Sequence, residues 1–265
     1  MSGQIIDLQA WYQTPVGAYL RAWEQMQVDA AVADIFGYHA LQLGLPDFDG
    51  LHNNRMPHQW LANEGWVDPV QGAAHGYPRK IALLTHFAAL PFSASSIDLV
   101  VLPHTLEFCS DPHGALREVQ RVLVPEGRVV ICGLNPASLW GLRQRRARLY
   151  QRLGIGDLFL PEGGEFIGHW RIRDWLRLLG FEVEQADFGC YRPSVQNEQW
   201  LQRTAWMDRM GERWWPIFGS AYFFVAVKRV KGMHLLAPNW KHAKARAPQS
   251  IPVANRRHDY LKTED

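Results

Sequence analysis

The sequence predicts an α/β protein with a doubly wound, mostly parallel sheet whose last strand is reversed. Short apolar runs, of the kind buried on both faces of a parallel sheet, recur along the chain. Stretches with helical spacing of apolar residues alternate with them, and short loops join the two. The last apolar run mixes polar and apolar positions, which we interpret as an edge strand in the reverse direction.

The first predicted element is a long amphipathic helix that ends near Ile35. Thr14 is a good N-cap residue and Pro15 suits the first helical position. A strand over residues 39–43 follows. We expect a helical extension over 1–36, a main domain over 37–230, and a basic, flexible tail over 231–265.

The other elements follow in chain order. The predicted strands are HQWLANE (58–64), KIALLTHF (80–87), IDLVVL (97–102), PEGRVVICGL (125–134), FEVEQADF (181–188) and SAYFFVAVKR (220–229). The predicted helices cover 111–123, 138–154, 171–180 and about 196–213. A doubly wound sheet binds its ligand at the carboxyl ends of its strands, so Gly44, Phe87, Pro103, His104 and Asn135 mark the expected site.

Composition indicates a soluble globular protein. Of the 265 residues, 47% are hydrophobic and 20% are charged, and the net charge of +2 indicates no particular partner. The three cysteines have no metal-ligand spacing, so we expect reduced thiols and no metal site. Neither a signal peptide nor an apolar stretch long enough for a membrane span is recognised, which favours a cytoplasmic location.

One segment resembles a known enzyme family. The matching residues are Leu90-Pro91-Phe92, Asp98, His104, Asp111-Pro112, Leu116, Glu118, Arg121-Val122-Leu123, Pro125 and Gly127. At this spacing they resemble the class I S-adenosylmethionine-dependent methyltransferases, in the quinone-biosynthesis-like (type 11) subgroup. The resemblance implies the Rossmann-like class I methyltransferase fold, S-adenosylmethionine as cofactor, and methyl transfer to an unidentified acceptor.

The family's glycine-rich loop is altered here. Its acid–x–Gly–x–Gly–x–Gly motif falls on QLGLPDF, where Gln42 replaces the acid and Gly44 keeps the first glycine. Pro46 and Phe48 replace the other two glycines, and proline also lacks a backbone donor. The resemblance still places the methionine end of the cofactor here, with Asp47 or Asp49 near its ammonium group.

The resemblance assigns further cofactor contacts. Asn63 or Glu64 is expected to accept the ribose hydroxyls, although a solvated loop carboxylate explains Glu64 equally well. His86 and Phe87 take the place of the family's adenine-binding residues, and Phe87 is either a stacking partner or a core residue. Pro103 ends the adjacent strand.

The catalytic candidates are His104 and Glu107, which follow the fourth strand, where the family's acceptor meets the methyl group. Histidine at this position suits a general base, and a histidine bonded to a backbone carbonyl is the alternative.

Two more features leave alternatives open. The Arg143–Arg152 helix and the basic tail suit RNA or an anionic surface, or are simply solvated. The apolar positions between Trp200 and Trp214 are either core or part of a bulky acceptor site. Besides a methyltransferase with a small-molecule acceptor, we therefore consider an inactive methyltransferase-like binding protein and a nucleic-acid-binding protein.

Overall fold

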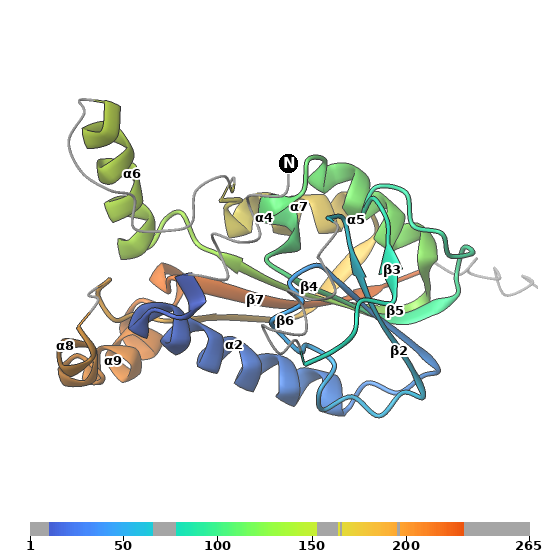
Figure 1. The fold of residues 1–265 in the computed structure, drawn as a ribbon, viewed down its shortest axis with the longest axis horizontal. Coiled ribbons are helices and arrows are strands. Elements are labelled where there is room, and N and C mark those ends of the chain that lie inside the picture. Colours follow the sequence, from blue (N-terminus) through green and yellow to red (C-terminus); the bar gives the residue numbers. More distant parts are fainter. Residues whose placement is uncertain (1–10, 66–77, 153–163, 165, 195–196, 231–265) are drawn as a thin grey trace, which may run out of the picture. The chain divides into compact units, whose positions relative to one another are not determined.

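The computed structural model describes residues 11–65, 78–152, 164, 166–194 and 197–230. In these residues the chain forms a seven-stranded sheet of order β3-β2-β1-β4-β5-β7-β6 (Figure 1). The strands are β1 (His39–Leu43), β2 (His58–Asn63), β3 (Leu83–Leu84), β4 (Ile97–Pro103), β5 (Leu123–Leu134), β6 (Phe181–Gly189) and β7 (Ala221–Lys228). The chain divides into two units, Met1–Val230 and Lys231–Asp265. The predicted basic tail therefore lies outside the described residues.

The direction of the last strand is confirmed, and its predicted place at the edge is wrong. The pairs among β3, β2, β1, β4 and β5 are parallel, whereas β7 runs antiparallel to both β5 and β6. β7 is interior and buried along its whole length. Its aromatic residues are covered on both faces, and β6, with its exposed glutamates, forms the edge.

The helices are α2 (Pro15–Ala33), α4 (Thr105–Phe108), α5 (Pro112–Val122), α6 (Leu139–Arg152), α7 (His169–Leu178), α8 (Glu198–Arg203) and α9 (Trp206–Trp214), followed by the 3-10 turn η1 (Pro216–Phe218). The single helix predicted over about 196–213 is wrong, because the chain breaks between α8 and α9. The hydroxyl of Thr204 donates to the carbonyl oxygens of Trp200 and Leu201, which closes α8 at that point.

Helices cover both faces of the sheet. α2 lies along one face, and α5 and α7 lie on the other (Figure 1). Alternate residues of β4 point to opposite faces, as the two-residue period requires. Leu99 and Val101 pack in the α2 cluster, whereas Val100 and Leu102 pack with α5 and α7.

α2 buries one stripe at intervals of four residues. Val16, Leu20, Val28 and Val32 are fully buried, as expected for the apolar face of a helix. Glu24 occupies the middle of the stripe and is only 1% exposed. Thr14 caps the helix as predicted, because its side chain accepts the N–H of Gly17.

The connection from β1 to β2 consists of turns. Residues 44–57 contain no helix, so β1 is followed by a compact loop that returns directly to β2. The strand predicted over 80–87 is shorter in the structure, where only Leu83–Leu84 pairs with β2. Both segments bring loops to the carboxyl ends of β1, β2 and β3.

Candidate active site at the carboxyl ends of the strands

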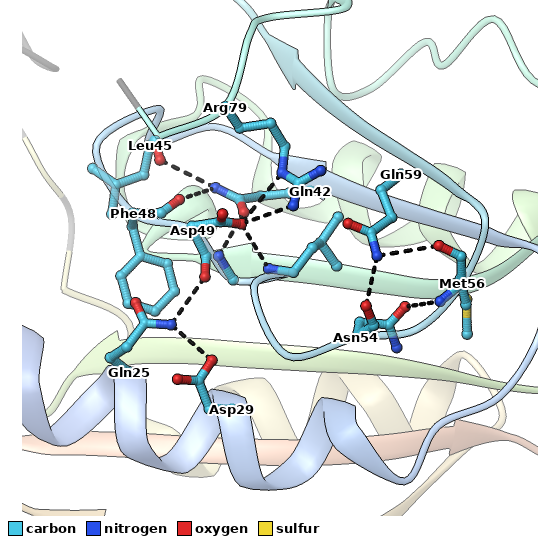
Figure 2. Close-up of polar contacts among 12 residues, drawn as sticks. Gln25, Asp29, Gln42, Leu45, Phe48, Asp49, Asn54, Met56, Gln59 and Arg79 are labelled. Carbon is cyan, nitrogen blue, oxygen red and sulfur yellow. Dashed lines mark hydrogen bonds and ion pairs between the residues drawn. The ribbon is translucent and has the colours of Figure 1, made fainter. Parts of the chain in front are cut away.

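Gln42 organises the loop that follows β1. Its side-chain N–H groups donate to the carbonyl oxygens of Leu45 (3.1 Å) and Phe48 (2.7 Å) (Figure 2). The same nitrogen also donates to the carbonyl oxygen of Gly44 at 3.1 Å. Its Oε1 accepts the backbone N–H of Gly50 at 2.9 Å. A carboxylate is unable to donate to the three carbonyls. The side chain is fully buried, and both of its polar atoms are engaged by the loop.

The two aspartates of this loop are also tied into the structure. Asp49 forms an ion pair with Arg79 at 3.2 Å, and its carbonyl oxygen accepts from Gln25 (Figure 2). The carbonyl oxygen of Asp47 accepts from Arg21 at 2.8 Å. These bonds fix the backbone of the loop against α2 and the segment before β3.

Gly44 has a left-handed backbone, with a φ of 76°. A Cβ added there would lie 3.5 Å from the ring of Phe87 and 3.6 Å from the hydroxyl of Thr105, which are ordinary contacts. The backbone conformation, rather than space, therefore favours glycine. Phe87 covers Gly44 and is 5% exposed in the core cluster.

Glu64 and Phe87 are linked across two loops. Oε1 of Glu64 accepts the backbone N–H of Phe87 at 2.7 Å and lies 3.4 Å from Nδ1 of His86. The His86 side chain is 77% exposed, so of these three it is the one that lies on the surface. Gly44, Glu64 and Phe87 thus come together from three separate parts of the chain.

Asn63 has an unused acceptor. It is fully buried at the end of β2, and its side-chain N–H donates to the carbonyl oxygen of Gly65 at 2.9 Å. Its Oδ1 is buried and has no hydrogen-bond partner in the part of the chain that the structure describes. A buried acceptor without a donor costs about 1–3 kcal/mol. A ligand hydroxyl is a donor of the kind that this atom lacks.

His104 lies between two buried carboxylates. Its Nδ1 is 2.8 Å from Oε2 of Glu107, and its Nε2 is 2.8 Å from Oε1 of Glu24. The second oxygen of Glu107 accepts the N–H of Leu134, and that of Glu24 accepts the hydroxyl of Tyr12 at 3.2 Å. All four carboxylate oxygens are therefore hydrogen-bonded.

This geometry favours a protonated imidazole. Burial lowers the pKa of His104, but the charges of Glu24 and Glu107 outweigh it and raise the pKa to about 10. Burial also raises the pKa of Glu107, and His104 opposes that effect. His104 itself has a left-handed backbone, with a φ of 53°, directly after Pro103 at the end of β4.

The structure joins the predicted residues into two groups. Gly44, Asn63, Glu64 and Phe87 surround the end of β1, and His104 joins Glu107 beside β4. Two members of the second group, Glu24 and Tyr12, were not found from the sequence. The signal for Glu24 is spacing, because it lies in the four-residue stripe of α2 where an apolar residue belongs, whereas Tyr12 lies before the N-cap of that helix.

An apolar cavity of about 590 Å³ lies nearby, between α6 and the α9–η1 segment. The residues between Trp200 and Trp214 that were assigned to either core or acceptor site are mostly exposed. Leu201 is 5% exposed and belongs to the core, whereas the other four are each more than two-fifths exposed: Trp200, Trp206, Met210 and Trp214. Trp206 and Met210 line the cavity.

Comparison with known proteins identifies the family. A family model described as a methyltransferase domain matches residues 55–131, which include β2 to most of β5. The uncharacterized protein YafS of Escherichia coli (strain K12) is 32% identical over 184 residues, which cover 69% of this chain and 68% of that protein. The chain belongs to the type 11 family of class I methyltransferases.

Other methyltransferases share parts of the sequence or the fold. A malonyl-[acyl-carrier protein] O-methyltransferase of Methylovorus sp. (strain MP688) is 40% identical over 68 residues, which are 26% of this chain and 23% of that enzyme. A Thermotoga maritima methyltransferase described as a possible histamine N-methyltransferase superposes with a TM-score of 0.57 at 15% identity, covering 83% of this chain and 94% of that one. The predicted class I methyltransferase fold is thereby confirmed.

The family implies S-adenosylmethionine as the methyl donor. The described residues fit its nucleoside half, because the unused Oδ1 of Asn63 matches a ribose hydroxyl donor. Gln42 offers no free polar atom to the methionine half. Within the described ranges, no group of three or more His, Cys, Asp or Glu is placed to hold a metal ion. Nor is any helix there both long and apolar enough to cross a membrane.

Proposed function

We propose that this methyltransferase transfers a methyl group from S-adenosylmethionine to an acceptor held beside the ends of β4 and β5. The observation that carries the proposal is the buried, unused acceptor of Asn63, close to the left-handed Gly44. Family membership supports the reaction class, and the carboxyl ends of the strands are where a doubly wound sheet binds its ligands.

The nucleoside is assigned to Asn63, which would accept a ribose hydroxyl. Glu64 holds the backbone of Phe87, whose ring packs in the core beside Gly44. The cofactor supplies an electrophilic methyl group on a sulfonium whose departure leaves a neutral thioether. The protein's main task is therefore to align the acceptor with that methyl group.

The buried pair after β4 is assigned a positioning role. A general base must be neutral, and the two carboxylates around His104 favour its cation. Glu107 also accepts the N–H of Leu134, the last residue of β5, so the pair joins the ends of β4 and β5. We infer that His104 and Glu107 hold the turn that faces the acceptor.

Calorimetric titration with S-adenosylhomocysteine tests the proposal. Asn63→Leu removes the acceptor and should weaken binding about tenfold or more, which corresponds to about 1.4 kcal/mol. Asn63→Asp keeps the acceptor but loses the donor to the carbonyl of Gly65, so it should fold less stably and still bind more tightly than Asn63→Leu. Asn53→Leu, on the exposed part of the same β1–β2 connection, is the matched control. No binding at millimolar ligand, or equal affinity in Asn63→Leu, would contradict the assignment.

The inactive binding protein remains the second candidate. It is favoured by Gln42, which occupies the position where the family has an acid. The polar atoms of its side chain form hydrogen bonds with the loop. Both candidates bind the cofactor, so turnover separates them. Transfer of an isotopically labelled methyl group to a mixture of candidate acceptors would establish the enzyme, whereas tight binding with no transfer would support the binding protein.

A further inference from the structure

The cavity between α6 and the α9–η1 segment lies beside the carboxyl end of β5, which is also where the proposed site lies. β7 is antiparallel to β5, and its first residue, Ala221, pairs with Leu134 at the carboxyl end of β5. Ser138 and Ser220, which follow β5 and precede β7, both line the cavity. It therefore lies beside the strand end that receives the hydrogen bond network of His104 and Glu107.

The walls of the cavity are apolar and anchored. They include Leu139 and Leu142 of α6 and Trp206, Met210, Trp215 and Phe218 of the α9–η1 segment. A volume of about 590 Å³ falls within the range of about 300–1,000 Å³ that small-molecule sites have.

Hydrogen bonds hold each wall in place. Asp208 fixes α9, because it accepts from Tyr19 of α2 and pairs with Arg192 at 2.8 Å. Arg143 of α6 donates to Ser194. The cavity is thus built between two secured helices.

A positively charged side chain, that of Arg145, lines this apolar cavity. Among the described residues that line the cavity, Arg145 is the one that carries a charge, and none of them is a carboxylate. Its side chain is exposed and forms no ion pair with any residue that the structure describes. The α6 sequence, LWGLRQRRARLYQR, contains no acid that would neutralise it. A guanidinium beside apolar walls suits a ligand that carries an anion on an apolar body.

We propose that this cavity binds the methyl acceptor, and that the acceptor is a small molecule with an apolar body and one anionic group that pairs with Arg145. The inference rests on the proposed function, which it deepens by naming the substrate class. A nucleic acid strand carries a phosphate at every nucleotide and is bound by rows of cations. The part of the chain that the structure describes contributes a single cation to the lining of this cavity, which matches a single anion.

Calorimetry with two matched probes tests the proposal. Dodecanoate and dodecanol, both used below their aggregation limits, share a chain length and differ in charge. We expect dodecanoate to bind more tightly, and Arg145→Gln to weaken dodecanoate about tenfold while leaving dodecanol unchanged. Arg146→Gln is the control, because Arg146 is the next residue on the helix, is exposed and does not line the cavity.

A second variant tests the apolar wall. Met210→Glu places a carboxylate in the cavity and should abolish binding of both probes, and the 41% exposure of Met210 makes the change tolerable to the fold. Circular dichroism verifies folding. The proposal is overturned if neither probe binds, or if Arg146→Gln weakens dodecanoate as much as Arg145→Gln does.

Other occupants give distinct results. If single-stranded RNA or anionic vesicles bind through Arg145 while dodecanoate does not, the acceptor class is wrong. A dimer that Met210→Glu dissociates, without dodecanoate binding, would assign the cavity to a second copy of the chain. S-adenosylhomocysteine is titrated separately. If it binds and dodecanoate does not, only the acceptor class is refuted. If dodecanoate binds and S-adenosylhomocysteine does not, only the cofactor site is refuted.

Discussion

Glu24→Gln is the sharpest test of the buried network around His104. The substitution removes one of two charges that hold the imidazolium, and glutamine retains the ability to hydrogen-bond with His104 and Tyr12. A hydrogen bond to a charged group contributes about 1.5–3 kcal/mol. Glu107 still balances the cation, and the bond between Glu24 and His104 is fully buried, so we expect the upper end of this range, about 3 kcal/mol.

The loss of stability in Glu24→Gln should depend on pH in a defined direction. The folded-state pKa of His104 is raised to about 10 from an ordinary value of 6.5. The unfolded chain therefore loses this proton first as pH rises. Stability from the cation is fully present below pH 6.5 and is lost as pH rises to about 10. The difference in free energy of unfolding between the unchanged protein and Glu24→Gln should be largest at pH 6.5 and below, and it should shrink as the pH rises toward 10.

Urea unfolding followed by far-ultraviolet circular dichroism, at several pH values, measures both effects. At about 3 kcal/mol per molar urea, the midpoint should fall by about 1 M at pH 6.5. Asp29→Asn is the control, because Asp29 is a partly exposed acid of the same helix that accepts from Gln25. A loss below about 1 kcal/mol, or a gap that does not change with pH, would refute a charged His104.

Two further predictions concern buried polar groups. Gln42→Glu removes the donor that three loop carbonyls share, so we expect a loss of about 2–4 kcal/mol in the free energy of unfolding, measured in urea. A loss under about 0.5 kcal/mol would show that the loop does not depend on the amide. Tyr222→Phe removes a buried hydroxyl that has no partner among the described residues, so we expect stability to rise by about 1 kcal/mol in a thermal scan. A clear decrease would indicate that the hydroxyl is satisfied by water or ligand.

Much of the fold was predictable because its signals are local. The apolar runs of β4 and β5 and the capped helix α5 are set by side-chain burial and by Asp111, whose carboxylate accepts the N–H of Gly114. The interior place of β7 was not predictable from the same signals, because strand order depends on which faces are covered by distant helices.

The site was harder to predict because its bonds join distant residues. Glu24 lies 80 residues before His104, and only its position in an apolar stripe indicates burial. The role of Gln42 depends on carbonyls that turn inward at Gly44 and Leu45, both of which have left-handed backbones. Residue types alone do not reveal that orientation, so the role of Gln42 in holding the loop was not predictable from the sequence.

The helix-free loop between β1 and β2 has a consequence for ligand choice. A helix that begins beside a ligand concentrates about half a positive charge at its first turn, which attracts anions. Residues 44–57 form turns, so their peptide dipoles do not add along one axis, and several of their carbonyls converge on the neutral amide of Gln42. The carboxylate of an amino-acid group therefore gains little electrostatic stabilisation from this loop. We expect the protein to recognise adenosine compounds mainly by their nucleoside and to bind compounds with different groups at the 5′ position.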